Sequence, residues 1–147
     1  MANDPISLSF EISCSPNEAD QDLILKGLIG FNLSEVGPSN ELPLAILMRN
    51  SDLAGEVVGG LSGYTAWGWL FIEKLWLPEA LRGQGLAAKL LADAEAEAHL
   101  RGCHSVWLDT FNPKALKLYR SQGYVVFGEL PDFPKGRSRF FLKKSLA

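Results

Sequence analysis

Three strand-like runs follow one another between Leu42 and Leu77, and this succession constrains the fold more than any other feature of the sequence. The runs read LPLAILMRN, GEVVGGLSGYTAW and WLFIEKLWL, and only short breaks separate them. Parallel neighbouring strands need a crossover of roughly a dozen residues or more, usually a helix, and neither break has room for one. The succession therefore predicts an antiparallel meander and argues against a doubly wound sheet.

Local patterns on either side of the meander predict the other elements. Residues 6–12 alternate apolar and polar side chains as a half-buried strand does, and SPNE, with Ser15 as N-cap, begins a helix to about Leu33. Further helices are expected from Leu86 to about Arg101 and from Pro113 to Gly123, and further strands at SVWLDT, YVVFGEL and SRFFLKK. We therefore expect one α+β domain over residues 1–147, built on a mixed sheet.

Composition narrows the class of protein. The 147 residues carry a net charge of −3 with both signs interspersed, so there is no basic stripe to displace counterions from a nucleic acid. Cys14 and Cys103 are too few for a disulfide framework, and no Cys/His cluster has metal-ligand spacing. No apolar run reaches the ~18 residues of a membrane helix, and the N-terminus lacks a signal pattern. We expect a cytoplasmic protein without nucleic-acid, membrane or metal partners.

The stretch RGQGLA, residues 82–87, stands between the third strand-like run and a helix. A helix N-terminus leaves backbone N–H groups unpaired and carries a partial positive charge. Gly83 and Gly85 let an oxyanion approach the backbone closely, and Arg82 adds a forked cationic donor. The stretch therefore predicts a cradle for a pyrophosphate group.

Three known phosphate-binding motifs are alternative interpretations of this stretch. A Walker A loop needs Lys followed by Ser or Thr, which is absent here. GQGLAA satisfies the dinucleotide pattern GxGxxA, with Asp109 downstream, but PEALR separates it from the strand and repeated strand–helix units are missing. RGQGLA also matches Q/R-x-x-G-x-G/A, and NPKALKLYRSQGY follows at residues 112–124. Through these motifs the chain resembles the GCN5-related N-acetyltransferase (GNAT) superfamily, in its branch of small, single-domain bacterial proteins.

The resemblance implies a three-layer fold with a central, splayed, mostly antiparallel sheet of about seven strands and helices on both faces. It implies acetyl-CoA as cosubstrate and no metal. A strand end would pair with the pantetheine arm, loop amides would take the pyrophosphate, and an Asn and a Tyr would contact the cofactor further along. The residues at these positions are Leu75, Trp76, Leu77, Arg82, Gly83, Gln84, Gly85, Leu86, Ala87, Asn112 and Tyr119. Asn112 is also a plausible helix N-cap.

Tyr119 and Glu73 are the candidate catalytic residues. By resemblance Tyr119 would protonate the departing thiolate, whereas its spacing alone also fits a core tyrosine. Glu73 lies in an apolar strand and shares by alternation a face with Phe71, Leu75 and Leu77. It could accept the proton of the acceptor amine, directly or through water, or it could be an exposed, solvated glutamate.

The implied activity is transfer of the acetyl group of acetyl-CoA to a primary amine by direct attack in a ternary complex. No nucleophile constellation is evident, which agrees with direct transfer. A small-molecule acceptor is favoured because no peptide-binding pattern is readable, and its identity stays open. The alternative is a non-catalytic acyl-CoA sensor or regulatory module. A homodimer is compatible with the family, in which dimers are common.

Overall fold

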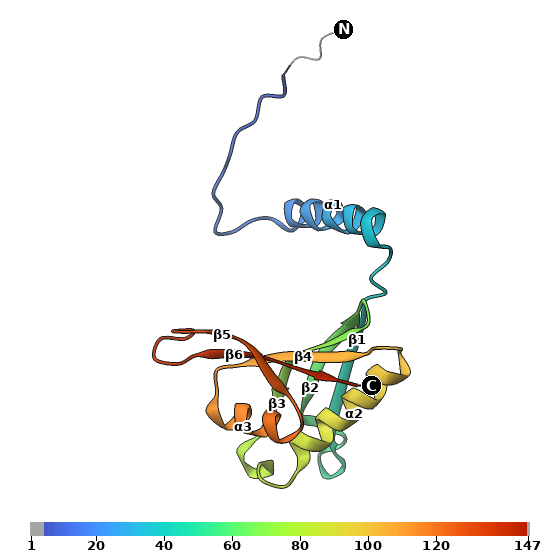
Figure 1. Cartoon of the computed structure of the whole chain (residues 1–147), viewed down its shortest axis with the longest axis vertical. Helices are drawn as coiled ribbons and strands as arrows, with labels where there is room; N and C mark the ends of the chain where they lie inside the picture. Colours follow the sequence, from blue (N-terminus) through green and yellow to red (C-terminus); the bar gives the residue numbers. More distant parts are fainter. Residues whose placement is uncertain (1–4, 147) are drawn as a thin grey trace. The chain divides into compact units, whose positions relative to one another are not determined.

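The computed structural model describes residues 5–146, and the chain divides into two compact units at residues 38 and 39 (Figure 1). The N-terminal unit contains one helix, α1 (Glu18–Val36). The C-terminal unit contains the sheet and two further helices. Among the described residues, no helix has the length and apolar character needed to cross a membrane.

Helix α1 begins later than its sequence suggests. The N-cap is Asn17, whose side-chain oxygen accepts a hydrogen bond from the backbone N–H of Asp20 at 2.8 Å, so the Ser15 prediction is wrong. Both residue types cap well, and Asn17 brings Glu18 and Asp20 into the first turn, where acidic side chains suit the helix dipole. The predicted strand over residues 6–12 is not formed. Alternation alone does not make a strand, because each strand also needs a hydrogen-bonded neighbour.

The C-terminal unit is a mixed, mostly antiparallel sheet in the order β1-β2-β3-β4-β6-β5. Only β3 and β4 run parallel, and β6 lies between β4 and β5. The α+β class and the meander are confirmed, with six strands instead of about seven because residues 6–12 form none. The elements are β1 (Leu42–Asn50), η1 (Ser51–Leu53), β2 (Glu56–Ala66), β3 (Trp69–Trp76), η2 (Glu79–Leu81), α2 (Leu86–Leu100), β4 (Ser105–Thr110), α3 (Pro113–Ser121), β5 (Val125–Leu130) and β6 (Arg139–Ser145).

One apolar core joins this sheet to α2 and α3. The helix α2 contributes Leu90, Leu91 and two alanines, all buried, at the helical spacing that the sequence predicts. The core faces of β3 and β4 contribute alternate residues, among them Leu70 and Leu108. The helix α3 adds Tyr119 at the edge of the same core.

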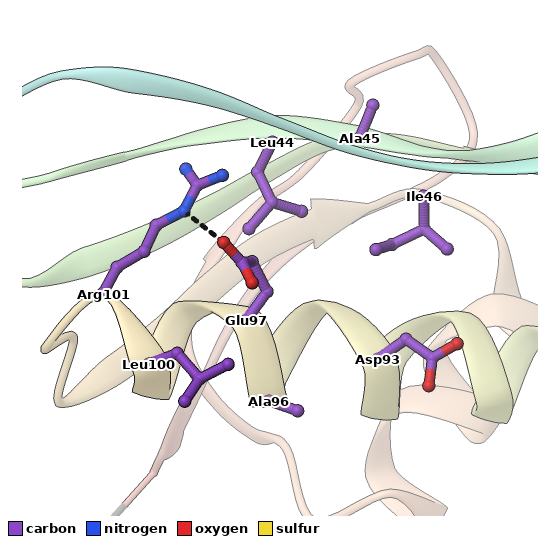
Figure 2. A pocket seen from close by; sticks show the side chains of 8 residues that line it. All are labelled: Leu44, Ala45, Ile46, Asp93, Ala96, Glu97, Leu100 and Arg101. Carbon is purple, nitrogen blue, oxygen red and sulfur yellow. Dashed lines mark hydrogen bonds and ion pairs between the residues drawn. The ribbon is translucent and has the colours of Figure 1, made fainter.

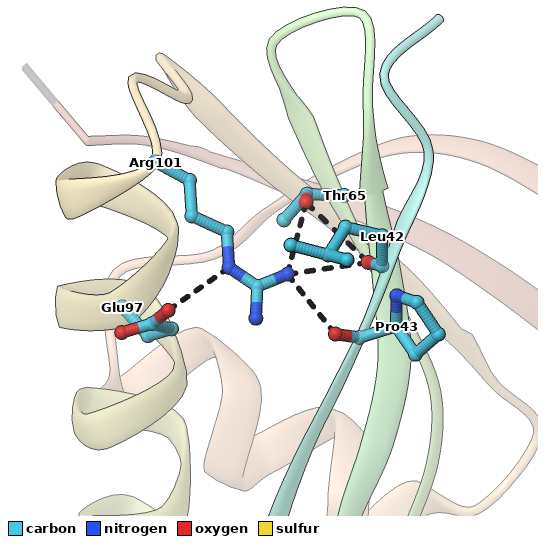
Figure 3. Close-up of polar contacts among 5 residues, drawn as sticks. All are labelled: Leu42, Pro43, Thr65, Glu97 and Arg101. Carbon is cyan, nitrogen blue, oxygen red and sulfur yellow. Dashed lines mark hydrogen bonds and ion pairs between the residues drawn. The ribbon is translucent and has the colours of Figure 1, made fainter.

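Arg101 fastens the C-terminal end of α2 to the meander (Figure 3). Its Nη1 donates to the carbonyl oxygens of Leu42 and Pro43 at 3.2 and 3.1 Å and to the hydroxyl of Thr65 at 3.1 Å. Its Nε donates to Glu97 at 2.9 Å. A cation here also suits the negative end of the helix dipole. One side chain thus fixes the distance between α2 and the outer strands.

A hollow of about 510 Å³ lies between α2 and β1 (Figure 2). Leu44 and Ile46 point from the strand toward the helix, while Ala45 points away. Leu100 and Ala96 line the helix side, with Asp93 and Glu97 beside them. None of the predicted site residues lines this hollow.

Candidate active site

Some of the predicted site residues line one cleft where β3 and β4 part, namely Glu73, Leu75, Trp76, Asn112 and Tyr119, whereas Leu77 and residues 82–87 do not line it. The two strands pair only from Trp69–Phe71 with Ser105–Trp107, so the ladder stops before the end of either strand. Beyond this point lies a cleft of about 520 Å³. It is lined by residues 72–76 of β3, residues 108–110 of β4, Phe111 and Asn112, Ala115 and Tyr119 of α3, and Arg139 of β6. The end of a parallel strand pair is where α/β sheets commonly bind ligands.

Glu73 lies in a β-bulge of β3. Ser62 pairs with Lys74 whereas Gly63 pairs with Ile72, so Glu73 is an extra residue without a partner on β2. The bulge reverses the alternation of the strand, as bulges near active sites often do. Leu75 therefore packs against the core that also contains Ile72, and the expectation that Glu73 shares a face with Leu75 and Leu77 is wrong. Glu73 itself is exposed on the cleft and makes no hydrogen bond or ion pair with a described residue.

Gly63 makes this bulge possible. A Cβ built on Gly63 would lie 1.9 Å from the carbonyl oxygen of Phe71 on β3, which no real side chain tolerates. The run GG-x-S-G in β2 was visible in the sequence, and a strand glycine is a signal for a bulge or a close backbone approach. The position of the bulge depends on the pairing of two strands, so it could not be read from β3 alone.

The glycine turn has the geometry that an anion cradle needs. Gly83 and Gly85 adopt φ values of 74° and 79°, in the left-handed region that favours glycine. A Cβ on either would meet no atom within 4 Å, so both face open space. Gly85 is the N-cap of α2 without a side-chain cap, and the first intrahelical bond comes from Lys89. The amides before Lys89 are therefore open to a ligand.

The side chains around this turn hold it in place. The Nε of Arg82 donates to the carbonyl oxygen of Leu77 at 2.9 Å, and the side-chain amide of Gln84 donates to the carbonyl oxygen of Ala80 at 3.1 Å. Leu86 packs against the core, as do Leu77 and Ala87. These residues can reach a ligand mainly through their backbone, whereas the exposed guanidinium of Arg82 keeps further donors.

Asn112 is the N-cap of α3, and Tyr119 lies in the last turn of this helix. Tyr119 is 7% exposed and lines the cleft. Burial, and then the negative charge of Asp109, raise the pKa of its phenol, so Tyr119 stays protonated at neutral pH. Asn112 caps α3 by accepting a hydrogen bond from the N–H of Lys114 at 2.9 Å, which confirms its predicted capping role. It also lines the cleft, so a second contact with a ligand stays a prediction.

Asp109 and Arg139 form an ion pair in the cleft that the sequence analysis did not assign to the site. The Nη1 of Arg139 lies 3.1 Å from Oδ1 of Asp109, and both side chains are 24% exposed. Asp109 pairs with Phe141, so Arg139 is its diagonal neighbour across β4 and β6. The two opposite charges were visible in the sequence, but their meeting depends on β6 lying beside β4.

The residues described give no sign of a metal centre. Among residues 5–146, no three His, Cys, Asp or Glu side chains lie close enough together to hold an ion. The ionisable groups of the cleft are two carboxylates, a lysine, a guanidinium and a protonated phenol, and Thr110 and Asn112 add a hydroxyl and an amide. Such a set can hold charged groups and move protons.

Comparison with known proteins gives a consistent result. Residues 20–124 match the model of the Acetyltransferase (GNAT) family. The chain is 42% identical over 137 residues to acetyltransferase Atu2258 of Agrobacterium fabrum, which covers 93% of this chain and 98% of the relative. It is 38% identical over 93 residues to the blasticidin-S acetyltransferase of Streptomyces morookaense, covering 63% and 68% of the two chains. A crystal structure from Agrobacterium tumefaciens, assigned as an acetyltransferase, superposes with a TM-score of 0.89 at 41% identity over 94% of this chain and 99% of that one.

Proposed function

Because the chain belongs to the GNAT acetyltransferase family, we propose that it transfers the acetyl group of acetyl-CoA to the primary amine of a small molecule. The observation that carries this proposal is the glycine turn at Gly83 and Gly85. Its two left-handed glycines face open space at the N-terminus of α2. This turn follows the end of β3, which is also one wall of the cleft.

The residues present fit acetyl-CoA. In this proposal the open amides of residues 83–87 and the cation of Arg82 bind the pyrophosphate, whereas the backbone N–H of Arg82 already donates to the carbonyl oxygen of Glu79. The backbone of Leu75, Trp76 and Leu77 pairs with the pantetheine arm as an added strand would. The ladder between β3 and β4 has already ended there, which leaves backbone groups of β3 available. The acetyl group then reaches the part of the cleft that Tyr119 lines.

The transfer proceeds by direct attack. The free amine forms a bond to the thioester carbon, and backbone N–H groups near Leu75–Leu77 stabilise the oxyanion. Glu73, or a water held by it, takes the proton that the nitrogen loses. The C–S bond breaks, and Tyr119 gives its proton to the sulfur. Burial keeps the phenol of Tyr119 protonated at neutral pH, so its proton is present when the C–S bond breaks.

A small-molecule acceptor is supported by the blasticidin-S acetyltransferase of S. morookaense, whose name gives the small molecule blasticidin S as its substrate. The size of the cleft agrees, since about 520 Å³ lies within the range of small-ligand pockets, roughly 300–1,000 Å³. The polar lining has both signs of charge, which suits an acceptor with several charged groups.

Calorimetric titration with acetyl-CoA, CoA and NAD tests the proposal. We expect acetyl-CoA and CoA to bind and NAD not to bind. Gly85→Asp puts a carboxylate where the pyrophosphate would lie, so acetyl-CoA binding should fall by about 100-fold or more, from charge repulsion and lost close approach. Arg82→Ala should weaken binding by about tenfold, as the loss of one ion-pairing donor does.

Gly102→Asp is the matched control. Gly102 has a φ of 84°, open space around it and a place at the other end of α2. It therefore incurs the same backbone strain and the same change in charge, and acetyl-CoA binding should change little. Equal losses in both variants would mean that strain alone is responsible and that the turn is no cradle.

Thiol release in a screen of primary amines separates the enzyme from the alternative function. Turnover with any amine supports the acetyltransferase. Tight acetyl-CoA binding without turnover in a broad screen would favour the non-catalytic acyl-CoA sensor. Binding of NAD in place of acetyl-CoA would refute both proposals.

A further inference from the structure

The guanidinium of Arg139 is held on three sides. Its Nη1 donates to Asp109 at 3.1 Å. Its central carbon lies 4.0 Å from the ring centroid of Phe133 and 5.1 Å from that of Phe111. Phe133 belongs to the loop between β5 and β6, and Phe111 follows β4, so three segments fix one side chain. A guanidinium held in this way is pre-organised and loses little entropy when it binds a ligand.

One edge of this guanidinium remains without a partner. The Nε is buried and has no hydrogen-bond partner, and no described residue bonds Nη2. These two nitrogens lie on the same side of the planar group and donate in parallel, which matches the two oxygens of a carboxylate. A buried donor without an acceptor is costly, so such a group in a native protein calls for an explanation.

We propose that the free edge of Arg139 binds a carboxylate of the acceptor, so that the substrate is an amine that also carries a carboxylate. This inference rests on the proposed acetyl transfer and specifies its substrate class. Arg139 and Tyr119 line the same cleft, so an acceptor anchored at Arg139 lies beside the position given to the thioester. Asp109 is the positioning residue, because it fixes Nη1 and leaves Nε and Nη2 without a partner among the described residues.

The other charges of the cleft agree with such an acceptor. Glu73 is exposed and unpaired, which leaves a carboxylate for the ammonium or for its proton. Lys74 is the other cation of the lining, but it is exposed and lacks the forked geometry. It therefore provides a control in the same cleft, because Lys74→Met removes a whole positive charge whereas Arg139→Lys keeps the charge and removes only the forked donor.

Nuclear magnetic resonance of the Arg139 Nε–Hε group tests the anchor without requiring turnover. The probes are N-acetylglycine and N-acetylglycinamide, which resemble an acetylated product and differ only in the carboxylate. Arg139→Lys assigns the resonance by its disappearance. We expect N-acetylglycine to shift this resonance in a saturable way and the amide to leave it unchanged. Equal shifts with both probes, or no shift with either, would overturn the inference. An equal shift with inorganic phosphate alone would also overturn it, because the site would then bind an adventitious ion only.

The variants separate an anchor from a merely structural clamp. Followed at the backbone N–H of Thr110, N-acetylglycine binding should weaken by about tenfold to 100-fold in Arg139→Lys, as loss of a charge-assisted bidentate pair implies. Lys74→Met should weaken it by about fivefold at most, as expected of an exposed ion pair. Equal weakening in both would overturn the anchor. If the wild-type protein does not bind acetyl-CoA in the calorimetric titration, the proposed function is refuted. If it binds acetyl-CoA but the Arg139 resonance does not shift, only the carboxylate anchor is refuted.

Discussion

Replacing Gly63 by Ala should destabilise the protein far more than a methyl group ordinarily does. The added Cβ would lie 1.9 Å from the carbonyl oxygen of Phe71, and real Cβ contacts essentially never come below 3.0 Å. Both groups belong to paired strands, so neither is a flexible side chain that can turn aside. One strand must therefore move by about 1 Å relative to the other, which is about a fifth of the ~4.8 Å between neighbouring strands.

The loss in free energy of unfolding can be estimated from this displacement. A movement of about 1 Å takes adjacent ladder hydrogen bonds beyond their normal length, and each contributes about 1 kcal/mol net. Forced overpacking adds about 1–3 kcal/mol. We expect the free energy of unfolding to fall by about 3 kcal/mol, or the bulge at Glu73 to be lost. Urea denaturation followed by tryptophan fluorescence and circular dichroism measures the first outcome.

Gly128→Ala is the matched control in β5. A Cβ there would meet Phe141 at 3.8 Å, an ordinary contact, and Gly128 does not have a positive φ. It should change the free energy of unfolding by under ~1 kcal/mol, the span of strand propensity. If Gly63→Ala is as stable as Gly128→Ala and binds acetyl-CoA as the wild type does, the reasoning from the close approach of β2 and β3 is refuted.

Three further predictions concern single side chains. Tyr119→Phe should slow acetyl transfer by about tenfold or more without changing acetyl-CoA affinity. The reason is that the thiolate of a thiol with a pKa of ~8.5 is only a moderate leaving group without a proton donor. An unchanged rate in single-turnover kinetics would remove Tyr119 from the mechanism. Tyr124→Phe should leave the free energy of unfolding unchanged or raise it, since the buried Tyr124 hydroxyl lacks a hydrogen-bond partner. Burial, with the charges of Glu95 and Tyr119, raises the pKa of Tyr124 in the folded state. Above pH ~10 the folded protein therefore binds more protons than the unfolded one, and the free energy of unfolding falls as pH rises. Denaturation as a function of pH should show a shallower alkaline fall in Tyr124→Phe, and an identical fall would contradict this. Arg101→Met should lower the free energy of unfolding by about 1–2 kcal/mol while leaving acetyl-CoA affinity unchanged, because its bonds fasten α2 to β1 and lie outside the cleft.

The features that the sequence predicts well are those with local causes. The C-terminal helices begin at Gly85 and Asn112 and end near Gly102 and Gly123, as the capping rules require. The meander follows from its short breaks, and the glycine turn lies where the motif indicates. These signals depend on residues within one or two turns of each other.

The features that were missed depend on distant residues. The bulge at Glu73 arises from Gly63 on another strand, so alternation along β3 placed Leu75 on the wrong face. The pair of Asp109 and Arg139 depends on the last strand lying beside β4. Residues 6–12 alternate apolar and polar side chains as a strand does, but they form no strand because no neighbouring strand pairs with them.

The place of β6 between β4 and β5 also sets the order in which the protein can be completed on the ribosome. The chain is made from its N-terminus, so the meander and α2 can pack while β6 is still unsynthesised. Until residues 139–145 emerge, one side of β4 is an open edge that could pair with another chain. Arg139 arrives with β6, so the wall of the cleft that it forms is completed only after β1 to β5 have been made. A chain that stops before residue 139 would keep the glycine turn but lack the wall of the cleft that Arg139 forms.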